Sequence, residues 1–229
     1  MSEPMQLMPK SVLARAAILA GIALLLGSCL FLVGCVRTSG GAWYVASAPL
    51  PEGWPELTPV GEVRIRQYPQ YRAASVTREA ADGGTGRMFN ALFDHIQRND
   101  IAMTAPVDMG YAASDAEGSP EVRAAKMESM AFLYRTTDLG PTGEDGPVRI
   151  EDVATATYAS VGVRGSYSQK NFEKGLAKVR DWLDAQVDWK PDGPPRYLGY
   201  NGPFTLWFMR YGEVQVPVVA ARSDAIGGG

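Results

Sequence analysis

Val63-Arg64-Ile65 recurs in the sequence as Val148-Arg149-Ile150, and Ala74-Ser75-Val76 recurs as Ala159-Ser160-Val161. Both recurrences have the same offset of 85 residues, which indicates an internal duplication. Around these tripeptides each copy reads alike, with two β-rich runs, a turn, a helical segment and two further strands. Two such ββαββ units predict one α+β domain, in which a distorted β-barrel or sheet is flanked by two helices.

The strands are placed by period-2 alternation and by runs rich in β-branched and aromatic residues. In the first copy they are predicted at residues 63–68, 71–78, 101–109 and 127–134. In the second copy they are predicted at residues 148–153, 156–164, 196–201 and 213–218. The two halves are too small to bury separate cores, so the domain is expected to be one unit over residues 62–218.

Two segments have the periodicity of amphipathic helices. The first is predicted at residues 87–98, after the breaker Gly83-Gly84-Thr85-Gly86. The second follows Ser168, a residue type that favours the N-cap. Its apolar stripe consists of Phe172, Leu176, Val179, Leu183 and Val187. Both stripes predict helices that cover a sheet.

Residues 1–34 resemble a signal peptide or an N-terminal membrane anchor. Residues 16–34 carry no charge, and Lys10 and Arg15 precede them. Because a spanning helix needs about 20 apolar residues, the length of this run fits either reading. The sequence Leu32-Val33-Gly34-Cys35 resembles the bacterial lipobox, so Cys35 is the expected lipidation site. Cys29 ranks second, and an uncleaved helical anchor is the alternative.

Either reading predicts a membrane-anchored domain outside the cytoplasm, on the periplasmic face of a bacterial membrane. Residues 35–61 are rich in Gly and Pro and predict a tether or extended strap. Trp43, Tyr44 and Trp54 are its expected anchors on the domain surface. Residues 219–229 predict a flexible tail.

Charge and composition exclude several classes of function. The net charge is −3 and no cluster of Lys or Arg occurs, so nucleic acid is not an expected partner. Two Cys and one His cannot build a Cys/His zinc site or a disulfide scaffold. The sequence lacks a Gly-x-Ser-x-Gly elbow and a phosphate-binding loop. These observations favour a binding protein over an enzyme.

Several motifs, in this order and spacing, resemble the SOUL haem-binding protein family over residues 62–218. They are Phe89–Ile96, Ile101–Val107 with its Met-Thr-Ala-Pro-Val run, Val148–Glu151, Gly199-Tyr200-Asn201-Gly202-Pro203 and Glu213-Val214. The resemblance implies a duplicated α+β barrel that binds haem or other tetrapyrroles in an apolar groove beside the first helix. It also implies kinship with bacterial domains that bind amphipathic small molecules in a similar cleft.

The candidate binding residues lie on and after the first helix. Phe89 and Phe93 match family pocket positions and supply apolar surface for a flat ligand. Met88, Met103 and Met109 are candidates for soft lining or iron ligation, with core packing as the alternative.

Charged and imidazole side chains are scarce near this predicted groove. His95 is the only histidine and the candidate axial haem ligand, unless it replaces a half-buried aromatic residue. Family positions that carry basic residues fall here on Gly86 and Asp94, so Arg87 and Arg98 remain as partners for the haem propionates.

The predicted function is therefore reversible, non-covalent binding of haem or a related tetrapyrrole, as a carrier, buffer or scavenger. One alternative is the binding of another amphipathic small molecule in the same groove. A second alternative is a hydrolase that uses a buried carboxylate, for which Glu213 and Glu151 are the candidates.

Overall fold

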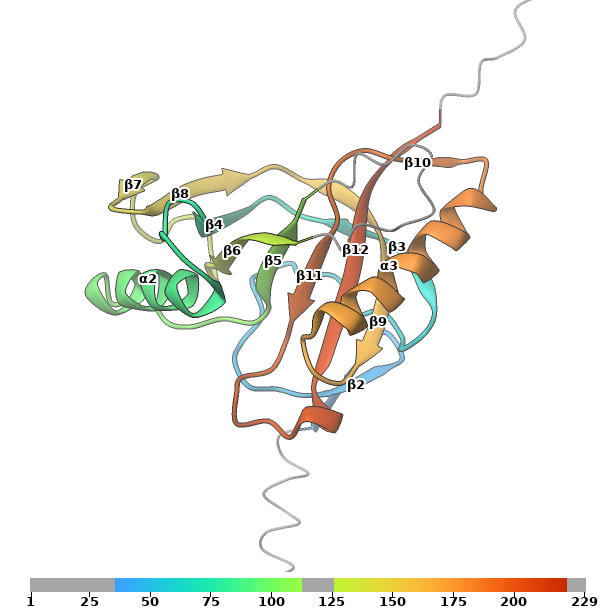
Figure 1. Ribbon diagram of the computed structural model, residues 1–229, viewed down its shortest axis with the longest axis horizontal. Coiled ribbons are helices and arrows are strands. Elements are labelled where there is room, and N and C mark those ends of the chain that lie inside the picture. Colours follow the sequence, from blue (N-terminus) through green and yellow to red (C-terminus); the bar gives the residue numbers. More distant parts are fainter. Residues whose placement is uncertain (1–35, 113–125, 222–229) are drawn as a thin grey trace, which may run out of the picture. The chain divides into compact units, whose positions relative to one another are not determined.

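The computed structural model of the protein describes residues 36–112 and 126–221 (Figure 1). The fold is carried by the unit of the chain that begins at Thr38. The predicted anchor, Cys29 and Cys35 lie outside the described residues, as does the end of the predicted tail. Among the helices of the described ranges, none has the length and apolarity needed to cross a membrane.

The predicted ββαββ order occurs twice. The first copy consists of β3 (Val63–Tyr68), β4 (Tyr71–Thr77), α2 (Thr85–Arg98), β5 (Val107–Tyr111) and β6 (Met127–Leu133). The second copy consists of β8 (Val148–Val153), β9 (Ala156–Arg164), α3 (Gln169–Asp184), β11 (Arg196–Gly199) and β12 (Tyr211–Ala220). This arrangement confirms the predicted α+β class.

Short elements connect and flank these units. They are β1 (Val36–Ser39), β2 (Ala42–Val45), β7 (Gly143–Asp145), β10 (Trp189–Pro191) and the 3₁₀ helix η1 (Trp207–Met209). β1 and β2 form a separate two-stranded sheet. The other ten strands form one sheet in the order β3-β9-β12-β11-β5-β6-β4-β8-β7, with β10 paired to β12. Its strand path is open at β3 and β7, so the strands form a sheet and not a closed barrel.

The two copies exchange their first strands. β3 pairs with β9 of the second copy, and β8 pairs with β4 of the first, both antiparallel. Arg64 lies opposite Ser160, and Ser75 lies opposite Arg149. These two pairs are related by the 85-residue offset of the recurring tripeptides, so the sequence repeat reflects equivalent strand pairings. The exchange interlocks the copies, because each copy supplies an outer strand to the sheet of the other.

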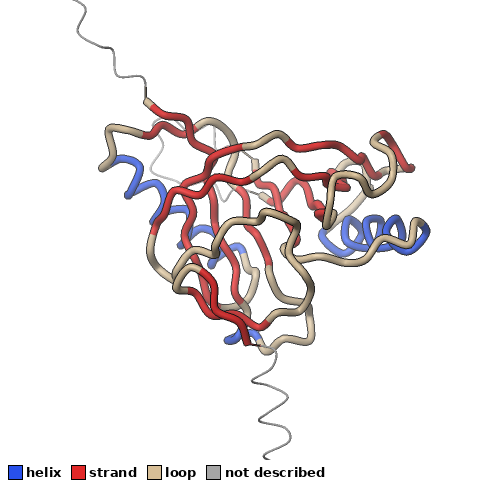
Figure 2. The backbone as a smooth tube through the Cα atoms, turned by 180° about the vertical axis from the view of Figure 1, so that it is seen from behind, coloured by secondary structure: helices blue, strands red, loops and turns tan. Residues whose placement is uncertain are grey.

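Each helix covers its own part of the sheet, and the two lie toward opposite ends of it (Figures 1 and 2). α2 packs on β4, β6 and β8, whereas α3 packs mainly on β9 and β12. Four of the five residues predicted as the stripe of α3 are buried. Val187 is 86% exposed, because the helix ends at Asp184, so this part of the prediction was wrong. The Ser168 side chain accepts a hydrogen bond from the Asn171 backbone N–H, which confirms the predicted N-cap.

The segment expected to be a tether or an extended strap belongs, from residue 38 onward, to the folded unit. Tyr44 and Leu57 are buried in a cluster with residues of β11 and β12. The Trp54 indole N–H donates a hydrogen bond of 3.1 Å to the Tyr200 hydroxyl, and the Thr58 backbone N–H donates one of 2.6 Å to Glu213. These contacts attach the strap to the second copy of the repeat.

The strand predicted at residues 101–109 begins only at Val107. Residues 101–106 form a loop instead, in which the Ala105–Pro106 peptide is cis. The Thr104 hydroxyl donates a hydrogen bond to the Leu133 carbonyl oxygen, and the Ala105 N–H donates one to the carbonyl oxygen of Pro49. The Met-Thr-Ala-Pro run therefore connects α2 to the sheet and to the strap.

Candidate functional site

An apolar cavity of about 440 Å³ lies beside α2. This volume is within the range of about 300–1,000 Å³ that is typical of small-molecule sites. Most of its lining comes from α2, from β5 and β6, from the loop before β5, and from the turn that follows β11. The strap adds Ser47 and Ala48, and the loops before α3 and β12 add Tyr167 and Arg210. The cavity thus lies where the two copies of the repeat meet, because β5 and β11 are neighbours in the sheet.

Phe89 and Phe93 form the wall that α2 contributes. They are one helical turn apart, and their rings stack with centroids 6.0 Å apart and an interplanar angle of 15°. Phe89 also packs against Phe132 on β6 in a T-shaped arrangement, at a centroid distance of 5.2 Å. Phe93 is 39% exposed and so marks the open side of the cavity. Both side chains line the cavity, and their role in ligand binding stays a prediction.

Thioether and aromatic side chains form the floor. On β5, Val107, Met109 and Tyr111 alternate in the chain and therefore face the same side. Met130 lies directly opposite Met109 in the β5–β6 register and also lines the cavity, as does Met103. Methionine adapts its shape to the ligand that it contacts.

The opposite wall is the turn Gly199–Pro203. Asn201 holds this turn in place, because its backbone N–H donates to the Tyr167 hydroxyl and its side-chain amide donates to the Val45 carbonyl oxygen, at 2.8 and 2.6 Å. Its Oδ1 accepts a hydrogen bond from the Tyr211 N–H at 2.7 Å. Asn201 is thus a positioning residue for the cavity wall, at the centre of the Gly-Tyr-Asn-Gly-Pro motif.

Arg210 is the only charged residue among the described residues that line this cavity. Its guanidinium donates hydrogen bonds to the carbonyl oxygens of Thr205 and Pro203, at 2.8 and 2.7 Å. A single cation at the edge of an otherwise apolar slot suits a ligand with a flat apolar body and an anionic group.

The model of the SOUL heme-binding protein family matches residues 56–217. The chain belongs to this family. The match covers the duplicated domain and the last residues of the strap, including both walls of the cavity. No curated protein matches the chain.

Solved structures share the SOUL domain's fold at low sequence identity. An uncharacterized conserved protein from Listeria innocua is 11% identical with a TM-score of 0.51, over 70% of this chain and 94% of that one. The EcmrR chain in a complex with DNA is 12% identical with a TM-score of 0.50. The matched region covers 69% of this chain and 57% of the EcmrR chain. A hydrolase from Listeria innocua is 8% identical with a TM-score of 0.48, over 71% of this chain and 94% of that one. At these identities the likeness concerns the fold alone.

Two of the residues predicted for the SOUL site lie outside the cavity. Met88 is fully buried in the main core, because it faces the sheet and not the open side of α2. Arg87 is exposed, and its guanidinium pairs with the backbone and carboxylate of Asp82. Arg210, from the second copy, is the cation that the structure brings to the cavity instead.

His95 is also placed away from the cavity. It is buried, with Nδ1 2.6 Å from the Asp145 carboxylate and Nε2 2.7 Å from the Tyr134 hydroxyl. A ring that carries its proton on Nδ1 can donate to Asp145 and accept from Tyr134 at Nε2. Hydrogen bonds from His95 and Arg98 lower the pKa of Asp145 to about 2. His95 therefore has no free ring nitrogen and joins α2 to β7 and the end of β6.

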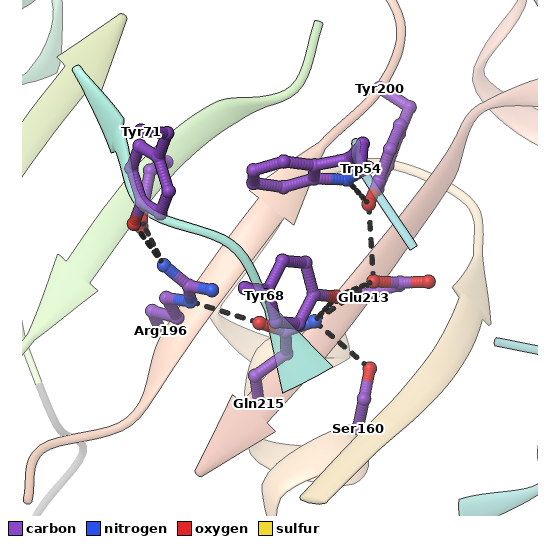
Figure 3. Close-up of polar contacts among 9 residues, drawn as sticks. Trp54, Tyr68, Tyr71, Ser160, Arg196, Tyr200, Glu213 and Gln215 are labelled. Atoms are coloured by element: carbon purple, nitrogen blue, oxygen red, sulfur yellow. Dashed lines mark hydrogen bonds and ion pairs between the residues drawn. The ribbon is translucent and has the colours of Figure 1, made fainter. Parts of the chain in front are cut away.

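Glu213 lies in a closed polar cluster on the strap side of β12 (Figure 3). Its side chain is 0% exposed and accepts hydrogen bonds from five donors. These are the backbone N–H of Thr58, the hydroxyls of Tyr68, Tyr200 and Tyr211, and the amide of Gln215. Burial, followed by the nearby carboxylate, raises the pKa of Tyr68 and of Tyr200, so both hydroxyls keep their protons. Glu151 is instead half-exposed and pairs with Arg149 at 3.1 Å.

Several lining residues were not singled out from the sequence. They are Tyr111, Met127, Met130, Tyr167 and Arg210. Period-2 alternation along β5 would have added Tyr111, once the strand was placed correctly. The others depend on which strands are neighbours and on the path of the loop before β12, which a local pattern does not reveal.

Proposed function

We propose that this protein binds haem or a related tetrapyrrole reversibly in the apolar cavity beside α2, as a carrier, buffer or scavenger. The observation that carries the proposal is the cavity itself, with a stacked Phe pair on one side and a fixed turn on the other. Membership of the SOUL family supports the same ligand class. The apolar walls would hold the macrocycle by surface burial, and no covalent step is involved.

The side chains that line the cavity fit a tetrapyrrole whose iron, if present, needs no imidazole ligand. Its walls carry aromatic rings and the thioethers of Met103 and Met109, which are soft enough to contact or ligate an iron centre. Arg210 would be the cation available to a propionate, because it borders the cavity. Among the described residues no group of three or more His, Cys, Asp or Glu could hold a metal ion.

We further propose that the domain is tethered to a membrane outside the cytoplasm. The uncharged run at residues 16–34 and the lipobox-like sequence that ends at Cys35 support this proposal. Mass spectrometry of the membrane-bound protein tests it. A lipidated Cys35 terminus supports the lipoprotein form, whereas an unprocessed Met1 terminus would support the helical anchor instead.

The cavity also suits another amphipathic ligand, since its contacts are apolar and only Arg210 is charged. The hydrolase alternative receives no such support. All five hydrogen bonds to Glu213 come from groups of the protein itself, and the carboxylate is sealed under the strap.

Haem titration of the full chain tests the proposed ligand. We expect a saturable change of the Soret band with one haem per chain at micromolar haem. A hydrophobic dye that saturates the cavity without any saturable haem spectrum would refute haem binding and leave the second ligand class.

A further inference from the structure

The loop between β11 and β12 exposes four large apolar side chains. We call Phe204, Leu206, Trp207 and Phe208 the aromatic loop. Phe204 is 99% exposed and Trp207 is 65% exposed. Contiguous exposed apolar surface of this kind marks an interaction site on a soluble domain.

The aromatic loop has a fixed backbone. Arg210 donates to the carbonyl oxygens of Thr205 and Pro203, and the Met209 N–H donates to the Leu206 carbonyl oxygen at 2.9 Å. Its side chains are therefore exposed because the backbone is held in a turn that points them outward. Little conformational entropy remains to be lost when the loop meets a partner.

A second exposed aromatic residue is tied to the same place. Arg164 donates one hydrogen bond to the Met209 carbonyl oxygen at 3.1 Å and another to the Trp43 carbonyl oxygen at 2.7 Å. Its guanidinium carbon also lies 3.7 Å from the centroid of the Trp43 ring. Trp43 on β2 and the 3₁₀ helix of the aromatic loop are thus neighbours, as Figure 1 shows for β2 and the short red helix.

We infer that the aromatic loop docks on the surface of a lipid bilayer. Trp and Phe next to Arg side chains are the residues that proteins place at the membrane interface. The chain itself points to this partner, because only residues 35–37 separate the uncharged run at 16–34 from Thr38. The four residue-to-residue steps from Gly34 to Thr38 span at most about 14 Å, and Trp43 follows Thr38 by five residues. The inference rests on the membrane tether proposed above.

Docking in this way would set the rim of the ligand cavity against the membrane. Gly202, Pro203 and Arg210 border the aromatic loop and also line the cavity. An amphipathic ligand would then pass between the bilayer and the cavity with little exposure to water.

Tryptophan fluorescence of the full chain, reconstituted in phosphatidylcholine vesicles with brominated acyl chains, tests the inference. The protein has five tryptophans, and only those that enter the acyl region are quenched. Trp207→Phe is expected to lower the quenched fraction about twofold or more, because it removes the more exposed of the two tryptophans at the proposed interface, Trp207 and Trp43. Phe204→Ser with Phe208→Ser is expected to lower it while keeping Trp207. Trp189→Phe, on β10, is the matched control and should leave the quenched fraction unchanged.

Flotation of the same vesicles separates the two proposals. If every variant floats with the vesicles, and the parent chain and Trp207→Phe are quenched equally, docking is overturned and the tether stands. Absence of the parent chain from the floating fraction would overturn the tether and the docking together. If Trp207 is shielded from water in the absence of lipid and is not quenched by the brominated acyl chains, protein covers the aromatic loop. This result would also overturn the inference.

Discussion

Phe89 and Phe93 stack against each other on α2, yet only Phe93 reaches the open side of the cavity. Phe89 packs on Phe132 and is fixed by the sheet. Among the described aromatic rings, Phe93 contacts only that of Phe89. The pair therefore joins the core of the domain to the ligand surface. Substitutions at the two positions should separate stability from binding.

Phe93→Ala is expected to weaken haem binding about tenfold, which is about 1.4 kcal/mol, because the ring supplies apolar contact area at the cavity mouth. The free energy of unfolding should change by less than about 0.5 kcal/mol, since the ring is partly exposed. Soret titration and urea unfolding measure the two effects. Val187→Ala, on an exposed apolar residue beyond α3, is the control and should change neither.

His95→Ala should leave the Soret spectrum and the haem affinity unchanged, because both ring nitrogens are used by Asp145 and Tyr134. The same change should lower the free energy of unfolding by about 1–3 kcal/mol, since it leaves the buried Tyr134 hydroxyl without its acceptor. A shifted Soret band in this variant would instead show that the imidazole ligates the iron.

Stability should fall in acid partly through Asp145. The pKa of this carboxyl is lowered to about 2 by its bonds to His95 and Arg98, compared with about 3.9 in an unfolded chain. A lowered pKa in the folded state gives stability that is fully present above about pH 4 and is lost as the pH falls toward 2. Asp145→Asn should therefore flatten the pH dependence of the urea midpoint over this window. Equal slopes for the two proteins would contradict the ion pairing.

Glu213→Gln should destabilise the fold by about 2–3 kcal/mol. The change replaces one accepting carboxylate oxygen by an NH2 group, which then faces the N–H and O–H donors around it. Urea unfolding measures the loss. Glu151→Gln is the matched change at a half-exposed carboxylate and should stay within about 0.5 kcal/mol. A Glu213→Gln protein as stable as the parent would mean that this carboxylate is kept for a role other than structure.

The strand exchange predicts that neither repeat folds alone. Fragments 1–141 and 142–229 each lack the partner of an outer strand, because β3 needs β9 and β8 needs β4. Expressed separately they should lack cooperative unfolding by circular dichroism, and expressed together they should copurify. Cooperative unfolding of one isolated fragment would contradict the interlocked arrangement.

Local patterns were sufficient to predict most of the architecture. The repeat offset, the period-2 runs and the N-cap at Ser168 predicted the order of elements in both copies. The sequence predicts that β5 begins at residue 101, whereas it begins at Val107. Residues 101–106 have the composition of a strand, but Ala105 and Thr104 form hydrogen bonds to the strap and to Leu133 instead. The exchange of β3 and β8 has no local signal at all, since it depends on pairing across the duplication.

The candidate site was less accessible from the sequence. Phe89, Phe93 and Met103 were placed through the family motif and the helix periodicity. For Met88 the sequence left ligand contact and core packing open, and its side chain is buried in the core, because a helical wheel does not show which part of a wide apolar face meets the sheet. The partners of His95 lie 39 and 50 residues away in the chain, so only the fold reveals that its ring is already engaged.

Hydrogen–deuterium exchange of the full chain, with and without haem, tests most directly whether the cavity beside α2 is the ligand site. We expect haem to slow exchange in three segments that line it, residues 85–93, 103–111 and 199–203. The segments around Asp145 and Glu213 should exchange as before. Protection confined to residues 134–150, around the His95 cluster, would contradict the account and move the site to the other side of α2.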